Sequence, residues 1–271
     1  MSSKIIIFGD SFADPASGGK YESEEDENFM AWYELLSKKY QIKNFGKAGT
    51  GPHYSFKKYY SFITNKRNQF RDYICIFFLS GEDRINFYGA PKVSNNINWD
   101  FVKKKSSWSV AENLEKEKKF YENFKSEIDF FYLTNHDELQ WSNIKNLGFL
   151  HMNSLLLNMK TIVFCTFGLK ILRQEFYGDF TELKTNNFYL FPYDLGKITE
   201  NEFIDTDENY GRDFVDHRRN HMSSVNHKIF YENIEKIIKN DYRLLPFAKN
   251  IDYIKNFGEL RDTKLGKFIY E

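Results

Sequence analysis

The residues of this sequence that could carry out chemistry are a serine in a Gly-Asp-Ser turn and a late segment rich in histidine and carboxylate side chains. Ser11 follows the apolar run 4–8, and Asp216 and His221 lie near the other end of the chain. A serine hydroxyl is a poor nucleophile until a base accepts its proton, donors stabilise the oxyanion and a carboxylate orients the base. The chain therefore contains the residue types that nucleophilic catalysis by a serine requires.

Short apolar runs alternate with segments of helical spacing, which predicts the elements that position these residues. Alternating strands and helices favour a parallel sheet with helices on both faces, and such sheets bind ligands at the carboxyl ends of their strands. The glycine-rich and polar segments that hold Ser11 and its candidate partners are expected at that edge. The predicted strands are 4–8, 41–45, 73–79, 161–167 and 188–191. The predicted helices are 29–40, 53–64, 225–239 and the segment 111–159, which forms either one helix or two that break near Thr134.

The order and spacing of the polar segments resemble the SGNH/GDSL hydrolase family, from Gly9 to about Asn233. The Gly-Asp-Ser turn is similar to the family's first motif, in which the serine, here Ser11, is the nucleophile and its own backbone amide contributes to the oxyanion hole. Residues 44–49, Asn-Phe-Gly-Lys-Ala-Gly, are similar to the second motif, whose last glycine, here Gly49, donates another amide. His221 before a predicted helix resembles the final motif, which makes it the general base.

The sequence departs from the family pattern at the acid that orients the histidine. The family places this acid three residues before the histidine, where this chain has Arg218. Asp216, five residues before His221, is our choice for the orienting acid, and Asp213 is the second choice. A pair of Asp213 and His217 has four-residue spacing, but His217 lacks the helix-leading context of His221.

The third family motif is altered as well. It reads Gly-x-Asn-Asp in the family, and its asparagine completes the oxyanion hole, whereas residues 81–84 of this chain read Gly-Glu-Asp-Arg. Because an ionised carboxylate cannot donate a hydrogen bond, we expect Asp83 to turn away or to pair with Arg84. Arg84 would then supply the missing positive charge to the oxyanion hole. Asp10 and Asn44 are expected beside the site as supporting residues, and Asn44 either holds the loop by hydrogen bonds or simply ends a strand.

The resemblance implies a fold and an activity. The expected fold is a single flavodoxin-like three-layer α/β/α domain over residues 1–271 with a central parallel sheet, the SGNH hydrolase fold. The expected activity is that of a serine esterase that cleaves a small-molecule or carbohydrate ester, such as an O-acetyl group, through an acyl-enzyme intermediate. The amino-acid sequence around His221, Arg-x-Asn-His-Met-Ser, also resembles that of proteins with this fold in bacteriophage genomes.

Two other functions remain open from the residues. The altered third motif suits a catalytically silent SGNH-like protein that serves in binding or assembly. The glycine-rich loop 46–51 suits a flavodoxin-like protein that binds a nucleotide.

Composition excludes several other classes of protein. Thirty-eight basic residues balance 38 acidic ones, so no general attraction to nucleic acid is expected. No apolar stretch reaches the roughly 18 residues that a membrane span needs, and the N-terminus enters a strand-like run without a signal peptide. We therefore expect a soluble, cytoplasmic or otherwise intracellular protein. Cys75 and Cys165 each lie in a strand-like run and are predicted to be core residues.

Three features lie outside the predicted catalytic segments. His217, His221 and His227 have a spacing that could suggest zinc, but the neighbouring arginines would repel a cation, so no metal or cofactor is expected. Residues 89–108 are polar and irregular, which suits a surface insertion or a lid. Residues 242–271 form a C-terminal tail to which the sequence assigns no role.

Overall fold

Five parallel strands form the central sheet, in the spatial order β2-β1-β3-β6-β7. This is the flavodoxin-like order. The first strand lies inside the sheet, the second strand is added on one side of it, and all later strands are added on the other side. The computed structural model describes residues 4–17, 30–65, 70–81, 84–85, 97–98, 123, 125–166, 185–200 and 219–247. The strands are β1 Lys4–Phe8, β2 Gln41–Asn44, β3 Tyr73–Leu79, β6 Lys160–Cys165 and β7 Phe188–Asp194.

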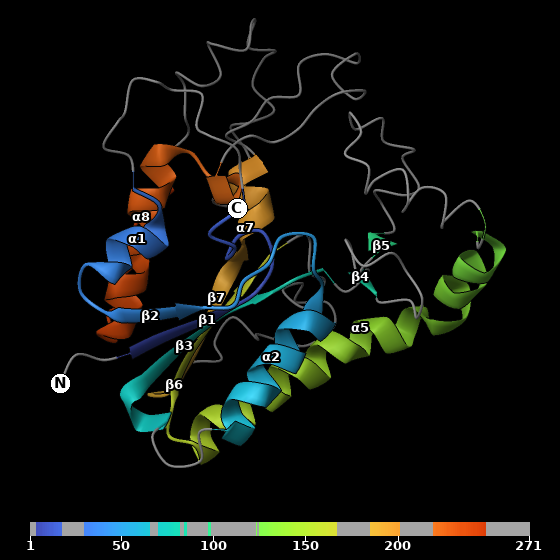
Figure 1. Ribbon diagram of the computed structural model, residues 1–271, viewed down its shortest axis with the longest axis horizontal. Coiled ribbons are helices and arrows are strands. Elements are labelled where there is room, and N and C mark those ends of the chain that lie inside the picture. Colours follow the sequence, from blue (N-terminus) through green and yellow to red (C-terminus); the bar gives the residue numbers. More distant parts are fainter. Residues whose placement is uncertain are drawn as a thin grey trace, which may run out of the picture.

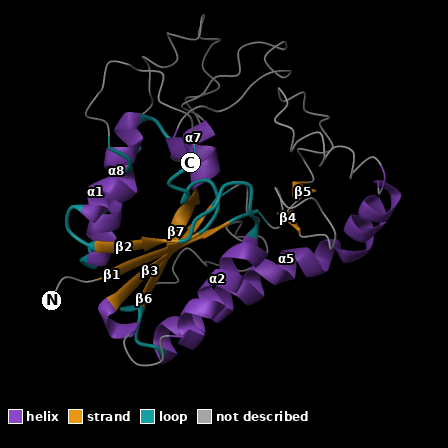
Figure 2. Cartoon of the chain, in the orientation of Figure 1, coloured by secondary structure: helices purple, strands orange, loops and turns teal. Residues whose placement is uncertain are grey.

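Helices cover both faces of the sheet, which confirms the predicted three-layer α/β/α architecture (Figures 1 and 2). The helices α1, Trp32–Ser37, and α8, Ser224–Ile238, lie on one face. The helices α2, Pro52–Asn65, and α5, Lys125–Leu156, lie on the other. The shorter elements are η1 Phe70–Asp72, α7 Leu195–Glu200 and η5 Arg219–His221, with β4 Arg84–Ile85 paired to β5 Ile97–Asn98 in a small antiparallel ladder.

The long helix α5 decides between two alternatives that the sequence leaves open. Residues 111–159 could form one helix or two with a break near Thr134, and the structure has one continuous helix from Lys125 to Leu156. The hydroxyl of Thr134 donates to the carbonyl oxygen of Phe130 at 2.8 Å, so this side chain is satisfied within the helix and does not end it. The part of the predicted helix before residue 123 lies outside the described residues.

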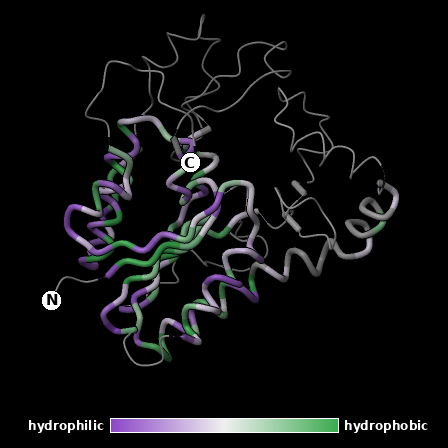
Figure 3. Tube along the Cα trace, in the orientation of Figure 1, coloured by the Kyte–Doolittle hydropathy of each residue, from purple (hydrophilic) through white to green (hydrophobic). Residues whose placement is uncertain are grey.

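The core is split by the sheet into two apolar layers, because successive strand side chains point to opposite faces. In β1, Ile5 and Ile7 face α1 and α8, whereas Ile6 and Phe8 face α2 and α5. Among the described residues, the strands of the central sheet accordingly carry long hydrophobic stretches (Figure 3). These nearly continuous apolar runs are typical of parallel strands that are buried on both faces.

The two cysteines lie in the layer beneath α2 and α5, as predicted for core residues. Cys75 on β3 and Cys165 on β6 are free thiols and fully buried. Burial raises the pKa of both thiols, and the Asp194 carboxylate raises that of Cys165 further. Both side chains therefore stay neutral and act as small apolar residues.

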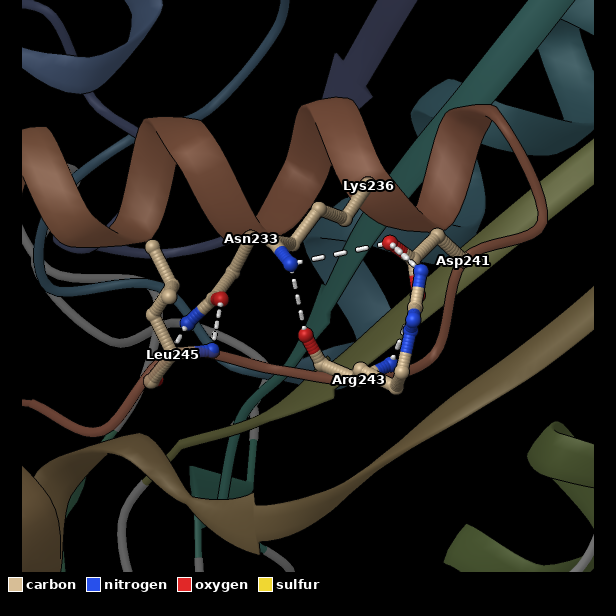
Figure 4. A network of polar contacts seen from close by, with 5 residues as sticks. All are labelled: Asn233, Lys236, Asp241, Arg243 and Leu245. Atoms are coloured by element: carbon tan, nitrogen blue, oxygen red, sulfur yellow. Dashed lines mark hydrogen bonds and ion pairs between the residues drawn. The ribbon is translucent and has the colours of Figure 1, made fainter.

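After α8 the chain returns along the helix, and the contacts in Figure 4 fasten it there. The buried side-chain amide of Asn233 donates to the Leu245 carbonyl oxygen at 2.9 Å and accepts from the Leu245 N–H at 2.7 Å. Lys236 donates to the carbonyl oxygen of Arg243 at 2.9 Å and lies 3.6 Å from the Asp241 carboxylate. The first residues of the expected tail, 242–247, thus pack on the fold.

Within the described ranges, no helix is both long and apolar enough to cross a lipid bilayer. Of the expected insertion at 89–108, the structure describes only Ile97 and Asn98, whose backbone pairs with Ile85 and Arg84.

Candidate active site

The side chains of Ser11 and His221 meet at the carboxyl edge of the sheet. Ser11 lies three residues after the end of β1, and His221 ends η5, three residues before α8 begins. The Nε2 atom of His221 lies 2.8 Å from the Oγ atom of Ser11, across a sequence separation of 210 residues. In the tautomer that carries its proton on Nδ1, this imidazole accepts the Ser11 hydroxyl proton.

The Ser11 hydroxyl is presented by a single helical turn that starts at Asp10. The N–H groups of Ala13 and Asp14 both donate to the Asp10 carbonyl oxygen at 3.0 Å. The Asp10 carboxylate, fully buried, accepts from the Phe12 N–H at 3.1 Å and from the Thr166 hydroxyl at 2.6 Å. Asp10 is therefore a structural anchor of the turn, with both carboxylate oxygens bound to the protein.

Side chains from distant elements bind the carbonyl oxygens of this turn, which we call the nucleophile turn, residues 10–14. A free turn leaves these acceptors without partners, because no further helical turn follows to use them. Here the Phe12 carbonyl accepts from Trp32 Nε1 at 3.3 Å, and the Ala13 carbonyl accepts from Asn44 Nδ2 at 2.7 Å. The nucleophile turn is thus held in place from α1 and from the end of β2.

Asn220 binds the same turn from the histidine side. Its Nδ2 atom donates to the Ser11 carbonyl at 2.7 Å and to the Asp14 carbonyl at 2.9 Å. One backbone donor of the turn is not used by the described part of the protein. Within the described ranges, the Ser11 backbone N–H has no hydrogen-bond acceptor. A free N–H next to the serine hydroxyl is the kind of donor that binds an oxyanion in acyl transfer.

The glycine-rich loop 46–49 lies against the nucleophile turn. A Cβ atom on Gly46 would come within 2.5 Å of the Ala13 Cβ, so this close approach requires glycine. Asn44 Oδ1 accepts from the Gly46 N–H, and the Asp14 carboxylate accepts from the Ala48 N–H, each at 2.8 Å. Asn44 and Asp14 therefore join the loop to the nucleophile turn.

Gly49 follows in a left-handed conformation, with φ of 72°, and a Cβ there would meet no atom within 4 Å. The amides before it are used within the protein, since the Lys47 N–H donates to the Gly9 carbonyl at 3.0 Å and those of Gly46 and Ala48 bind side chains. A loop that cradles a phosphate needs several free N–H groups. The N–H groups of residues 46–48 are therefore committed within the protein and are not free to bind a phosphate.

Charged and aromatic side chains surround this loop. Two ammonium groups lie near the ring of Tyr54. The distance to the ring centre is 5.9 Å for Lys47 and 5.5 Å for Lys58. Burial, and then the negative charge of Asp14, raise the pKa of Tyr54. Tyr54 is therefore a neutral hydroxyl beside the loop at physiological pH.

The local backbone directs the His221 ring. Asn220 and His221 both have left-handed φ values, of 51° and 60°, which turn the chain sharply before α8. The imidazole lies against the Phe12 ring, with a centroid distance of 5.0 Å. Ser223 then begins α8 as its N-cap, where its hydroxyl accepts from the Asn226 N–H at 3.3 Å.

Several predicted site residues fall outside the described residues: Asp83, Asp213, Asp216 and His217. Gly81 is buried two residues after the end of β3, and Arg84 begins β4, where the structure describes its backbone alone. The structure thus brings Ser11, His221 and the glycine-rich loop together and leaves the orienting acid and the third motif as predictions.

His227 is held by the fold. It is fully buried in α8, and its Nδ1 atom accepts from the Trp32 backbone N–H at 3.2 Å. Across the described part of the chain, no group of three or more His, Cys, Asp or Glu side chains is placed to hold a metal ion. The ring thus joins α8 to the start of α1.

Sequence reasoning missed four residues whose side chains hold the site: Asp14, Trp32, Thr166 and Asn220. Thr166 comes directly after β6, so the rule that functional residues follow parallel strands would have found it. Asp14 and Asn220 carry no local signal, because each acts on a segment that is distant in the sequence.

Comparison of this chain with protein-family models, with curated proteins and with solved structures finds no match. The site is therefore defined by its own geometry. It consists of a nearly buried serine hydroxyl, 7% exposed as a residue, hydrogen-bonded to an imidazole at the carboxyl edge of a parallel sheet.

Proposed function

We propose that this protein is a serine esterase of the SGNH/GDSL type, with Ser11 as nucleophile and His221 as general base. The observation that carries the proposal is the 2.8 Å contact between Ser11 Oγ and His221 Nε2. A nucleophile within hydrogen-bond reach of a base is the arrangement that acyl transfer by serine requires.

The fixed position of the serine also supports the proposal. Donors from α1, β2 and η5 hold the carbonyl oxygens of the nucleophile turn, so the hydroxyl needs little rearrangement before attack. Preorganisation of this kind lowers the barrier because the reacting atoms are already oriented. A turn with a purely structural role would not need a buried hydroxyl aimed at an imidazole.

The reaction begins when Ser11 Oγ attacks the carbonyl carbon of the ester and its proton passes to His221 Nε2. The negative charge that develops on the carbonyl oxygen is stabilised by the backbone N–H groups of Ser11 and Gly49. The ester C–O bond then breaks, and the leaving alcohol takes the proton from His221. A water molecule, deprotonated by His221, attacks the acyl-serine. The acyl–Oγ bond then breaks, Ser11 Oγ takes the proton back from His221, and the carboxylic acid leaves.

An acid must orient the His221 ring throughout these steps, and Asp216 is proposed for this role, with Asp213 as the second choice. The positive charge of Arg84 is proposed to assist the oxyanion where the family has an asparagine. The proposed substrate is a small acyl ester, such as an O-acetyl group on a carbohydrate, because the nucleophile is only 7% exposed.

The test is covalent labelling of the folded full-length protein with a fluorophosphonate, which reacts only with an activated serine. We expect the wild type to be labelled on Ser11 and to hydrolyse p-nitrophenyl acetate faster than longer acyl esters. Ser11→Ala is expected to abolish both signals. Ser37→Ala, which changes an exposed serine at the end of α1, is the matched control and should behave as the wild type.

The opposite result identifies the catalytically silent alternative. If the folded wild type is not labelled and Ser11→Ala leaves ester turnover unchanged, the protein is not a serine hydrolase. The altered third motif at 81–84 would then mark an SGNH-like fold that serves in binding or assembly.

A further inference from the structure

We infer that Asn220 is a positioning residue, which holds the His221 imidazole at the Ser11 hydroxyl by binding the Ser11 and Asp14 carbonyl oxygens of the nucleophile turn. This inference rests on the proposed function and adds to it a residue that the family motifs do not assign. Asn220 itself touches no reacting atom. Its effect passes through the backbone to the adjacent His221.

The contacts of Asn220 form a direct bridge between the two catalytic segments. The Nδ2 atom of Asn220 donates to two carbonyl oxygens, that of Ser11 at 2.7 Å and that of Asp14 at 2.9 Å. Its own backbone N–H points to the Ser17 carbonyl oxygen at 3.4 Å. Because His221 is the next residue, any shift of Asn220 from the turn also moves the imidazole.

The conformation of the bridge is demanding. Asn220 lies at φ 51° and ψ 29°, and His221 follows at φ 60°. Two successive non-glycine residues in this region are costly, and asparagine adopts it more readily than most side chains. A strained conformation persists only where surrounding contacts enforce it, and here the two hydrogen bonds to the nucleophile turn do so.

Among the described residues, the side chain of Asn220 acts as a hydrogen-bond donor and not as an acceptor. Asn220 is fully buried, and its Oδ1 atom accepts no hydrogen bond from the part of the chain that the structure describes. The two N–H groups on Nδ2, in contrast, are both used. Asn220→Asp therefore keeps the shape but sets a carboxylate oxygen against two carbonyl oxygens.

The experiment measures the rate of Ser11 phosphonylation by a fluorophosphonate in the folded full-length protein. Asn220→Asp removes the donors, and Asn220→Gly removes the side chain while allowing the left-handed backbone. We expect both variants to react more slowly by a factor on the order of ten to a hundred, which is what a small misplacement of catalytic groups costs. For p-nitrophenyl acetate, kcat should fall while KM stays near its wild-type value.

Asn158→Gly is the matched control. Asn158 also has a left-handed φ, of 50°, but it lies between α5 and β6, at the opposite edge of the sheet. Its labelling rate should equal that of the wild type. If Asn220→Asp fails to fold, Asn220→Gly decides; labelling of Asn220→Gly at the wild-type rate overturns the inference.

A second readout separates this inference from the proposed function. If the wild type itself is not labelled, the proposed function fails, and nitrogen NMR of the His221 ring then tests the bridge without any turnover. In Asn220→Gly the Nε2 resonance should move toward its position in Ser11→Ala, where the hydroxyl partner is gone. A resonance that stays at its wild-type position would show that Asn220 does not position His221.

Discussion

Ser11 Oγ and His221 Nε2 lie 2.8 Å apart, although 210 residues separate them along the chain. β1 delivers the serine to the carboxyl edge of the sheet, and the turn before α8 delivers the histidine to the same place. The fold therefore creates a pair that neither segment contains by itself.

Replacement of the histidine tests this pair from the side of the base. His221→Gln removes the proton acceptor, so turnover of p-nitrophenyl acetate should fall on the order of a thousandfold or more. His151→Gln, on α5, is the control and should keep turnover near the wild-type value. Equal turnover of wild type and His221→Gln would exclude His221 as the base.

The close approach of Gly46 to the nucleophile turn predicts a cost for any side chain there. In Gly46→Ala the new Cβ would lie 2.5 Å from the Ala13 Cβ and 2.6 Å from its carbonyl carbon. We expect a loss of about 1–3 kcal/mol in the free energy of unfolding, measured in urea.

Gly148→Ala is the control for Gly46→Ala, because it adds a Cβ where no other atom is close. A Cβ on Gly148, inside α5, would meet no atom within 4 Å. Gly148→Ala should therefore stabilise the protein by roughly 0.5–1 kcal/mol, because alanine favours a helix interior over glycine. If both variants shifted stability in the same direction, the packing argument for Gly46 would be wrong.

The attachment of residues 241–247 to α8 depends on Asn233. Asn233→Ala removes two hydrogen bonds to the backbone of Leu245, so the free energy of unfolding should fall by about 2–3 kcal/mol. Lys228→Ala, at an exposed position of the same helix, should change it by no more than about 0.5 kcal/mol. Similar values for the two variants would show that Asn233 does not anchor this segment.

The two thiols should be inert in the folded protein. Burial raises the pKa of Cys75 and Cys165, so neither forms the reactive thiolate near neutral pH. With Ellman's reagent we expect no reaction under native conditions and reaction of both thiols in guanidinium chloride. Rapid reaction of the native protein would contradict the buried positions.

The lowered pKa of Lys160 predicts that the free energy of unfolding depends on pH. Burial lowers the pKa of this half-buried lysine to about 8, from an ordinary value of 10.5. Its amine donates to the Ile238 carbonyl at 3.0 Å and to Asn240 Oδ1 at 2.6 Å, two bonds that the neutral amine can still make. Between these two pKa values the unfolded chain binds more protons than the folded one, so the contribution of Lys160 to stability rises with pH.

The comparison with Lys160→Met isolates this contribution. The difference in the free energy of unfolding, wild type minus variant, should increase from pH 8 to pH 10.5. The increase should be on the order of 1 kcal/mol or less, because solvent screens a half-exposed ammonium. A difference that stays flat or falls over this range would show that the lysine is not destabilised in its charged form.

Local sequence was sufficient for much of the fold. The apolar runs predicted β1 and β3 with the bounds that the structure has, since strands buried on both faces read as continuous hydrophobic stretches. It was not sufficient for α5, because the residues near Thr134 left open whether the helix breaks there, and the hydroxyl of Thr134 instead bonds within a continuous helix.

For the candidate site, the sequence by itself determined the types of the proposed catalytic residues and their order along the chain. Ser11 and His221 carry local signals, because each stands at the junction of a turn with a strand or a helix. The tertiary structure alone decided what holds them: Asn220 on the Ser11 carbonyl, Thr166 on Asp10, and Ala13 against Gly46. Hydrogen-bond partners and close approaches of this kind depend on how separate loops meet at the sheet edge, and no local pattern of residues encodes that meeting.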